Sequence, residues 1–157
     1  YFIMTCSSVK AEAVKKTGLL NENLPGYGID LHYSYRLWKD FPDGLYFSPD
    51  ITVRMHKLKS IGRALDDFTD YGRRNVSIIL EEFPQLAPYM GVDFVKAPGQ
   101  NVSVRSVMGN TFINRPAMAL ARGLYQLLPF PLSNKFVRYL MAASIVTGYR
   151  SSFKDDD

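Results

Sequence analysis

Apolar side chains recur at helical spacing in the first quarter of the chain. Ser8 and Gly18 bracket a short helix, the serine as its N-cap and the glycine as the left-handed residue that ends it. A second helix is predicted from Asp30, and Leu31 and Tyr35 begin its apolar face. A carboxylate is favoured at such a start, because the first turn of a helix has unpaired backbone N–H groups and a positive dipole end.

Three short apolar runs have instead the composition of strands. Residues 1–6, 45–47 and 51–56 are rich in β-branched and aromatic side chains, and the third run alternates apolar and polar positions. The turn sequences FPDG and SPD lie before and between the last two runs. The pattern therefore predicts strands as well as helices in the first part of the chain.

The rest of the chain has a helical pattern. A long amphipathic helix is predicted over 60–83 and ends before Pro84, which cannot continue it. Two further helices are predicted at 116–128 and 133–149, with the sequence PFP between them. These last two helices are expected to form a hairpin.

The net charge of +4 comes entirely from the C-terminal part of the chain. Residues 1–100 hold twelve basic and twelve acidic side chains, whereas 101–154 hold seven basic and no acidic ones. A content of 46% apolar and 22% charged residues is typical of a globular protein, and 157 residues suffice for one core. The basic excess indicates either a surface for phosphates of lipid or nucleic acid, or an ordinary solvated face.

The predicted C-terminal hairpin is too short in its apolar stretches to cross a bilayer, which needs about 20 apolar residues. Its pattern fits a hairpin that lies on an anionic membrane surface, and it fits equally well the packing of apolar residues inside the same protein. The residues concerned are Leu127, Leu128, Phe130 and Leu132 at the tip and Arg115, Arg122, Lys135 and Arg138 around it.

Several kinds of chemistry are excluded by what the sequence lacks. Cys6 is the only cysteine, so no disulfide within the chain and no zinc site of several cysteines can form. The glycine-rich nucleotide motifs, the H-E-x-x-H motif and the G-x-S-x-G elbow are absent. A lone cysteine fits a reducing compartment, and we expect a cytoplasmic protein, or one at the inner face of the cell membrane. Because the chain begins with YFIM and no signal peptide, we expect a cut inside a longer protein.

The stretch VKKTGLLNENLPGYGIDLHYSYRLWKDFPDGLYFSPDITVRMH resembles the second half of the catalytic domain of family two glycosyltransferases. These enzymes have the GT-A fold, and their pattern runs from a helix ending in iGlfdE through EDxDLxxRL to a strand ending in VxH. The resemblance covers residues 2–56. It implies an α/β fold with a mixed sheet, in which 1–60 is the acceptor side of a partial GT-A domain and 61–157 is a helical C-terminal region.

The resemblance assigns the role of catalytic base to Asp30. This residue lies six positions before Arg36, as the family's aspartate lies before the arginine of its RL pair. In an inverting transfer such a base takes the proton of the acceptor hydroxyl. Ile29 and His32 stand where the family has further acids. Without the resemblance, a lone aspartate at a helix start is more often a cap than a catalyst.

The resemblance also implies a metal ligand and an acceptor site. His56 corresponds to the histidine of VxH and would bind Mn or Mg, with most other ligands in the absent N-terminal half; the alternative is a strand-end histidine without a ligand role. Tyr27, Gly28 and Trp38 would contact the acceptor, because aromatic faces suit sugars and glycine leaves room beside the backbone. Trp38 at helical spacing also fits an ordinary core position.

Two functions from different classes follow. The first is an inverting glycosyltransferase fragment that moves a sugar from a nucleotide-sugar donor to a glycan or lipid-linked acceptor, in cell-surface polysaccharide or glycolipid synthesis, and that is incomplete without its nucleotide-binding half. The second is a non-catalytic basic helical module that makes peripheral contact with anionic membrane or, less favoured, binds nucleic acid. Its contacts would be Arg105, Arg115, Arg122, Lys135, Arg138 and Arg150.

Overall fold

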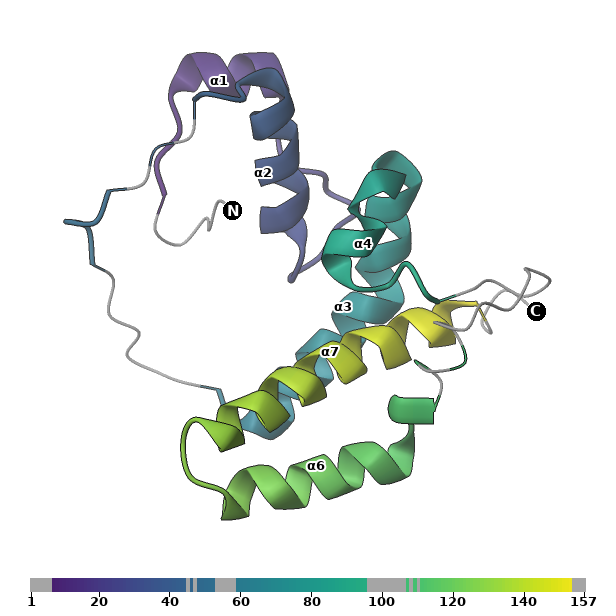
Figure 1. Cartoon of the computed structure of the whole chain (residues 1–157). Coiled ribbons are helices and arrows are strands. Elements are labelled where there is room, and N and C mark those ends of the chain that lie inside the picture. Colours follow the sequence, from purple (N-terminus) through teal and green to yellow (C-terminus); the bar gives the residue numbers. More distant parts are fainter. Residues whose placement is uncertain are drawn as a thin grey trace. The chain divides into compact units, whose positions relative to one another are not determined.

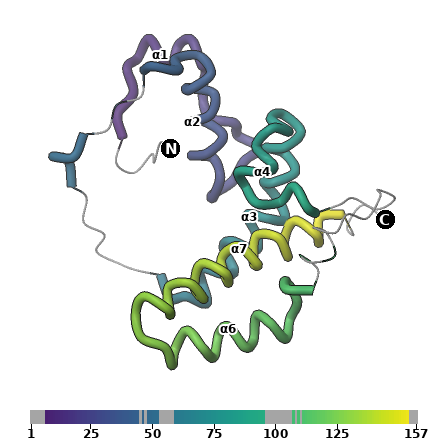
Figure 2. The backbone as a smooth tube through the Cα atoms, viewed as in Figure 1, coloured from purple at the N-terminus to yellow at the C-terminus, as the bar shows by residue number. Residues whose placement is uncertain are grey.

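The computed structural model describes residues 7–44, 46, 48–52, 59–95, 107, 109 and 111–153, and these residues form helices and no strand. The chain divides into two compact units, 1–59 and 60–157. Figures 1 and 2 trace the course of the helices. The first unit holds α1 (Ala11–Thr17) and α2 (Ile29–Asp40), and the second holds α3 (Ile61–Glu82), the 3-10 turn η2 (Pro84–Leu86), α4 (Ala87–Met90), α6 (Arg115–Leu127) and α7 (Leu132–Ser152).

Five helices that the sequence pattern predicts are confirmed. They are α1, α2, α3, α6 and α7, each within a few residues of its predicted bounds. Ser60 caps α3 by accepting a hydrogen bond from the Arg63 backbone N–H, and Asn114 caps α6 in the same way. The prediction that Ser8 caps the first helix is wrong, because α1 begins after Lys10 and has no side-chain cap.

The first unit contains a helix–loop–helix in which an arginine of α2 binds the end of α1. The Arg36 guanidinium donates from Nη1 to the Leu19 carbonyl at 3.0 Å and from Nη2 to the Thr17 carbonyl. The last carbonyls of a helix have no partner within the helix, so Arg36 satisfies groups that would otherwise need water. The Thr17 hydroxyl donates in turn to Asp40 Oδ2 at 2.6 Å. The C-terminal end of α1 is thereby bound to α2.

The predicted α/β fold with a mixed sheet is wrong, and with it the assignment to the GT-A fold. Most of the described residues that carried the resemblance lie in α1, α2 and the loop between them. Tyr46, Ile51 and Thr52, from the predicted strands, belong to no strand, and the other residues of those runs lie outside the described ranges. The match therefore rested on a helix–loop–helix pattern, in which Arg36 donates to the Leu19 carbonyl and Leu37 is buried.

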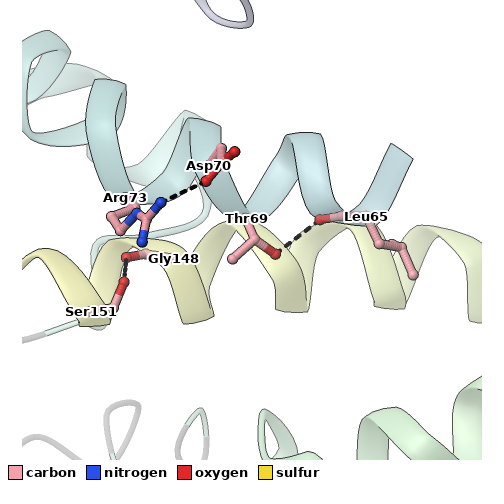
Figure 3. A network of polar contacts seen from close by, with 6 residues as sticks. All are labelled: Leu65, Thr69, Asp70, Arg73, Gly148 and Ser151. Atoms are coloured by element: carbon pink, nitrogen blue, oxygen red, sulfur yellow. Dashed lines mark hydrogen bonds and ion pairs between the residues drawn. The ribbon is translucent and has the colours of Figure 1, made fainter. Parts of the chain in front are cut away.

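The core of the second unit is built where α3 and α7 cross. A Cβ atom added to Gly72 would overlap the carbonyl oxygen of Ile145, and one added to Gly148 would overlap that of Thr69. The two backbones can approach this closely only because neither glycine has a side chain. Figure 3 shows the helices side by side at the crossing, with the Thr69 hydroxyl bonded back to the Leu65 carbonyl at 2.9 Å.

Two apolar clusters flank this crossing. In the first, Leu65 of α3, Ala121 of α6 and Leu140 of α7 are fully buried and bring three helices together. In the second, Val76 and Val146 pack with Val92, which follows α4. Ala121 is the only described residue of α6 that is fully buried, so α6 lies at the edge of the core.

Candidate functional site

The loop before α2 and the first turn of that helix hold three of the predicted site residues. Gly28 is the N-cap of α2 and has φ of 91°, in the left-handed region that a side chain disfavours. Asp30 follows in the first turn and is half-buried. Within the described ranges its carboxylate makes no hydrogen bond or ion pair, so its position at the positive end of the helix dipole is its evident stabilising interaction.

Tyr27, in this loop, contacts the ammonium group of Lys59. The Lys59 ammonium donates to the Tyr27 hydroxyl at 3.3 Å and lies 5.1 Å from the centre of the ring. Contacts of this kind at exposed sites contribute about 0.5–1 kcal/mol. Tyr27 therefore has a structural role, which ties residue 59 to the loop before α2.

Trp38 lies away from these residues. It is eight positions beyond Asp30 on α2, which is about 12 Å along a helix axis. Its ring is 47% exposed and tilts against that of Tyr35, with the ring centres 5.6 Å apart. The opposite side of the helix is buried through His32, Tyr33 and Leu37. The structure thus brings Tyr27, Gly28 and Asp30 together but leaves Trp38 two turns away.

No metal site is seen in the part of the chain that the structure describes. Those residues contain no group of three or more His, Cys, Asp or Glu side chains placed to hold an ion. His56, the predicted ligand, lies outside the described ranges. A Mn or Mg site at His56 therefore stays a prediction.

The second candidate site is the α6–α7 hairpin. The two helices lie side by side and a short loop joins them (Figure 1). The inner side of α6 packs against α7 and α3 through Ala121, Met118 and Tyr125. This contact confirms that part of the apolar pattern in the hairpin belongs to the core.

The outer side of α6 is apolar as well, and it is exposed. Leu120 is 65% exposed and Leu127 is 80% exposed, and a spacing of seven residues places both on one side of the helix. Phe130, in the loop after α6, is 79% exposed, and Leu132, at the start of α7, is 46% exposed. We call these four residues the outer stripe.

The sequence pattern pointed to three members of the outer stripe but not to Leu120. The sequence could have indicated that Leu120 is exposed, because the apolar residues of α6 fall at two different angular positions around the helix. Ala121 and Tyr125 lie at one of them, and Leu120 and Leu127 lie roughly 100° or more away from it. A helix with a single buried face needs only the first set.

Exposed basic side chains lie on the same hairpin, and those of α6 point away from the outer stripe. Arg115 and Arg122 are exposed, and each precedes a leucine of the stripe by five residues, which places it about 140° around the helix from that leucine. Lys135 and Arg138 are exposed on the first turns of α7. No acidic residue occurs between Asp93 and Asp155 in the sequence, so acidic neighbours along the chain do not offset this charge.

Arg150 differs from the other basic residues of this region. It is half-buried, and its Nη1 donates to the Ile113 carbonyl at 3.1 Å. Burial lowers the pKa of the Arg150 guanidinium from its ordinary value. Arg150 thus holds the segment before α6 in place. Arg105, another predicted contact, lies outside the described ranges. The exposed basic set consists of Arg115, Arg122, Lys135 and Arg138.

Comparisons of the chain with models of known protein families, with curated proteins and with solved structures gave no match. The resemblance to family two glycosyltransferases therefore gains no support from them. None of the described helices combines the length and the apolar character needed to cross a membrane.

Proposed function

We propose that this protein binds anionic membrane surfaces reversibly through the α6–α7 hairpin. The observation that carries the proposal is the exposed outer stripe on a hairpin that also carries four exposed basic side chains, in a region of the sequence without acidic residues. Leucine and phenylalanine lose unfavourable contact with water on entering a bilayer, and arginine and lysine are attracted to its phosphates.

The size of each contribution favours weak, reversible binding. A basic side chain near an anionic membrane contributes about 1 kcal/mol, and burying one leucine or phenylalanine about 1.5–3 kcal/mol. The loss of translational and rotational freedom on association costs several kcal/mol, about 4 or more. Four basic side chains therefore only about balance this cost, so insertion of the outer stripe must supply the net affinity.

Nucleic acid is the less favoured partner. Binding to a phosphate backbone needs only basic side chains, and it gives no role to Leu120 and Leu127. A surface for single strands would need several aromatic rings on which bases stack. Phe130 is the only aromatic residue of the outer stripe.

Sugar transfer with Asp30 as the base stays a prediction. It followed from the resemblance, and no contact among the described residues favours it over the role of Asp30 at the helix dipole. A transfer assay on Asp30→Asn in a protein that carries a nucleotide-binding half would test it.

The membrane proposal is tested by sedimentation with vesicles. The whole chain should bind vesicles that contain phosphatidylserine and should not bind neutral phosphatidylcholine vesicles, and binding should weaken as salt screens the charges. Replacing Arg115, Arg122, Lys135 and Arg138 by glutamine should weaken binding by about a hundredfold or more, because each contributes about 1 kcal/mol.

A matched control changes the net charge equally in another place. Lys10, Lys15, Arg63 and Arg74 are also exposed, and replacing these four by glutamine should leave most of the binding intact. Equal loss in both variants would show that only net charge matters and would contradict the assignment to the hairpin. Binding of a nucleic-acid duplex in preference to vesicles would favour the other partner.

A further inference from the structure

Most of the large exposed apolar side chains of the hairpin lie at its tip, residues 127–132. These six residues have the sequence LLPFPL, and all of them except the half-buried Leu128 are exposed. Leu127 is 80% exposed and Phe130 is 79% exposed. Leu120, the remaining member of the outer stripe, lies seven positions before Leu127, which is about 10 Å along the helix axis. The tip is therefore apolar on its own, without Leu120.

Three exposed basic side chains lie within two helical turns of the tip. The two helices lie side by side, and α6 ends at Leu127 where α7 begins at Leu132, so a distance along either axis measures height above the tip (Figure 1). Lys135 is about 4–5 Å above the tip along α7, and Arg138 is about 9 Å above it. Arg122 is about 7–8 Å above the tip along α6.

These heights match the depth at which apolar side chains enter a bilayer. An interfacial segment inserts its apolar side chains about 5–10 Å into the boundary between headgroups and acyl chains. When a hairpin enters a bilayer by its tip, height decides which charges meet the phosphates. The direction around the helix matters little, because phosphates surround the hairpin and the long stems of lysine and arginine extend toward them.

Arg115 lies too high for the same contact. It is seven residues before Arg122, which places it about 10 Å farther from the tip along α6. This difference exceeds the Debye length of about 8 Å at physiological ionic strength, so salt screens most of its attraction to the phosphates.

We propose that the hairpin meets an anionic bilayer end-on and inserts its tip through Leu127, Phe130 and Leu132. The three basic side chains near the tip then lie at the level of the lipid phosphates, whereas Leu120 and Arg115 stay in water. This inference rests on the proposed function and names the part of the outer stripe that enters the membrane.

The charge around the tip favours a lipid surface as its partner. Between Asp93 and Asp155 the sequence has no acidic residue, so the residues around the tip are positive or neutral. A second copy that met the tip with its own tip would bring the same positive charges, whereas an anionic bilayer brings the opposite charge on every side. A partner along the exposed side of α6 would use Leu120 as much as Leu127.

The test compares two pairs of positions on α6 that differ in height. Arg115 and Arg122 are both exposed, as are Leu120 and Leu127, and seven residues separate the members of each pair, so both members point in nearly the same direction. The measurement is binding of the whole chain to vesicles that contain phosphatidylserine. Arg122→Gln should weaken binding about fivefold, and Arg115→Gln by less than about twofold.

The leucines should differ in the same way. Leu127→Ser should weaken binding at least about tenfold, because serine gains little on entering the acyl layer, whereas Leu120→Ser should change binding by less than about twofold. Phe130→Ser should also weaken it at least about tenfold. Circular dichroism of each variant should show the helix content of the original chain, because these side chains are exposed.

A second measurement reports depth. A fluorescent label on Phe130→Cys, in a chain with Cys6→Ser, should be quenched by brominated acyl chains when the protein is bound. The same label on Leu120→Cys should be quenched much less. Equal effects within either pair of variants, or equal quenching of the two labels, would overturn end-on insertion and leave the proposed function standing.

Two further outcomes separate the partners. Sedimentation velocity that showed dimers which Phe130→Ser dissociates would assign the tip to a second copy and overturn this inference. Absence of binding to any anionic vesicle would overturn both this inference and the proposed function.

Discussion

At the scale of single residues, glycine has opposite effects at different places in this protein. Gly72 and Gly148 lie where α3 and α7 touch backbone to backbone, and an added methyl group would overlap a carbonyl oxygen of the other helix. Gly123 has open space around it in α6. The first two positions are required by packing, whereas the third only lowers the intrinsic stability of its helix.

Gly72→Ala is therefore expected to destabilise the protein, and Gly123→Ala to stabilise it. Overpacking against a rigid backbone costs about 1–3 kcal/mol, and relief of a glycine inside a helix contributes about 0.5–1 kcal/mol. Urea unfolding of the second unit, followed by circular dichroism, measures both. Equal effects of the two substitutions would show that the α3–α7 crossing is looser than described.

At the scale of elements, a few contacts bind the end of α1 to α2, and Arg36 makes two of them. Arg36 donates to two carbonyls at and beyond the end of α1, and Gly18 leaves room for its guanidinium, because a Cβ atom there would lie 3.1 Å from Nη2. A helix as short as α1 is not stable alone in water. The bonds of Arg36, the bond between Thr17 and Asp40, and the contacts of Lys16 with the Asp40 carbonyl and the Phe41 ring therefore support it.

Arg36→Lys is expected to release α1 while α2 stays helical. Lysine keeps the charge but lacks the planar guanidinium, so it cannot donate hydrogen bonds to both carbonyls. Losing one of these bonds should lower the free energy of unfolding by about 1–3 kcal/mol. Hydrogen exchange should show faster exchange at the amides of 13–18, and little change in α3. The control is Lys39→Arg, an exposed position near the end of α2, which should change neither. Unchanged exchange in α1 would contradict the role of Arg36.

The same element shows how far the sequence led and where it failed. The period of Leu31 and Tyr35 was sufficient to predict α2, because a repeated spacing reports the local helix directly. The six-residue spacing of Asp30 and Arg36 was taken from a family with a sheet, but it describes only two positions on one helix. The bonds of Arg36 to Thr17 and Leu19 supply another reason for an arginine there, and a sequence does not reveal bonds between two helices.

The candidate surface was only partly predictable for a similar reason. Phe130 and Leu132 were expected at the tip because they flank a proline turn. To predict that Leu120 is exposed, one must know which side of α6 faces the core. That depends on where Leu65 and Leu140 lie in three dimensions. Arg150 was expected on the surface because of its charge, whereas the structure buries half of it against the Ile113 carbonyl.

At the scale of the whole molecule, two partly buried tyrosines of α7 pack against the core of the second unit. Tyr139 donates its hydroxyl to the Phe112 carbonyl at 2.5 Å, and Tyr149 packs on the ring of Phe153 with ring centres 4.9 Å apart. Burial raises the pKa of both phenols above their ordinary value. The folded unit thus favours the neutral form of each.

Stability should accordingly be complete below the ordinary tyrosine pKa of about 10 and should fall as the pH rises through the higher values in the folded state, because the unfolded chain loses its phenolic protons first. Melting temperatures at closely spaced pH values across this range measure the effect. Tyr149→Phe should make the decline shallower, because it removes one of the two phenols whose pKa is raised by burial. Tyr89→Phe, at a ring that is 87% exposed, is the control and should leave the decline unchanged. If Tyr149→Phe and Tyr89→Phe gave the same pH dependence, burial of the Tyr149 phenol would not contribute to the stability of the fold.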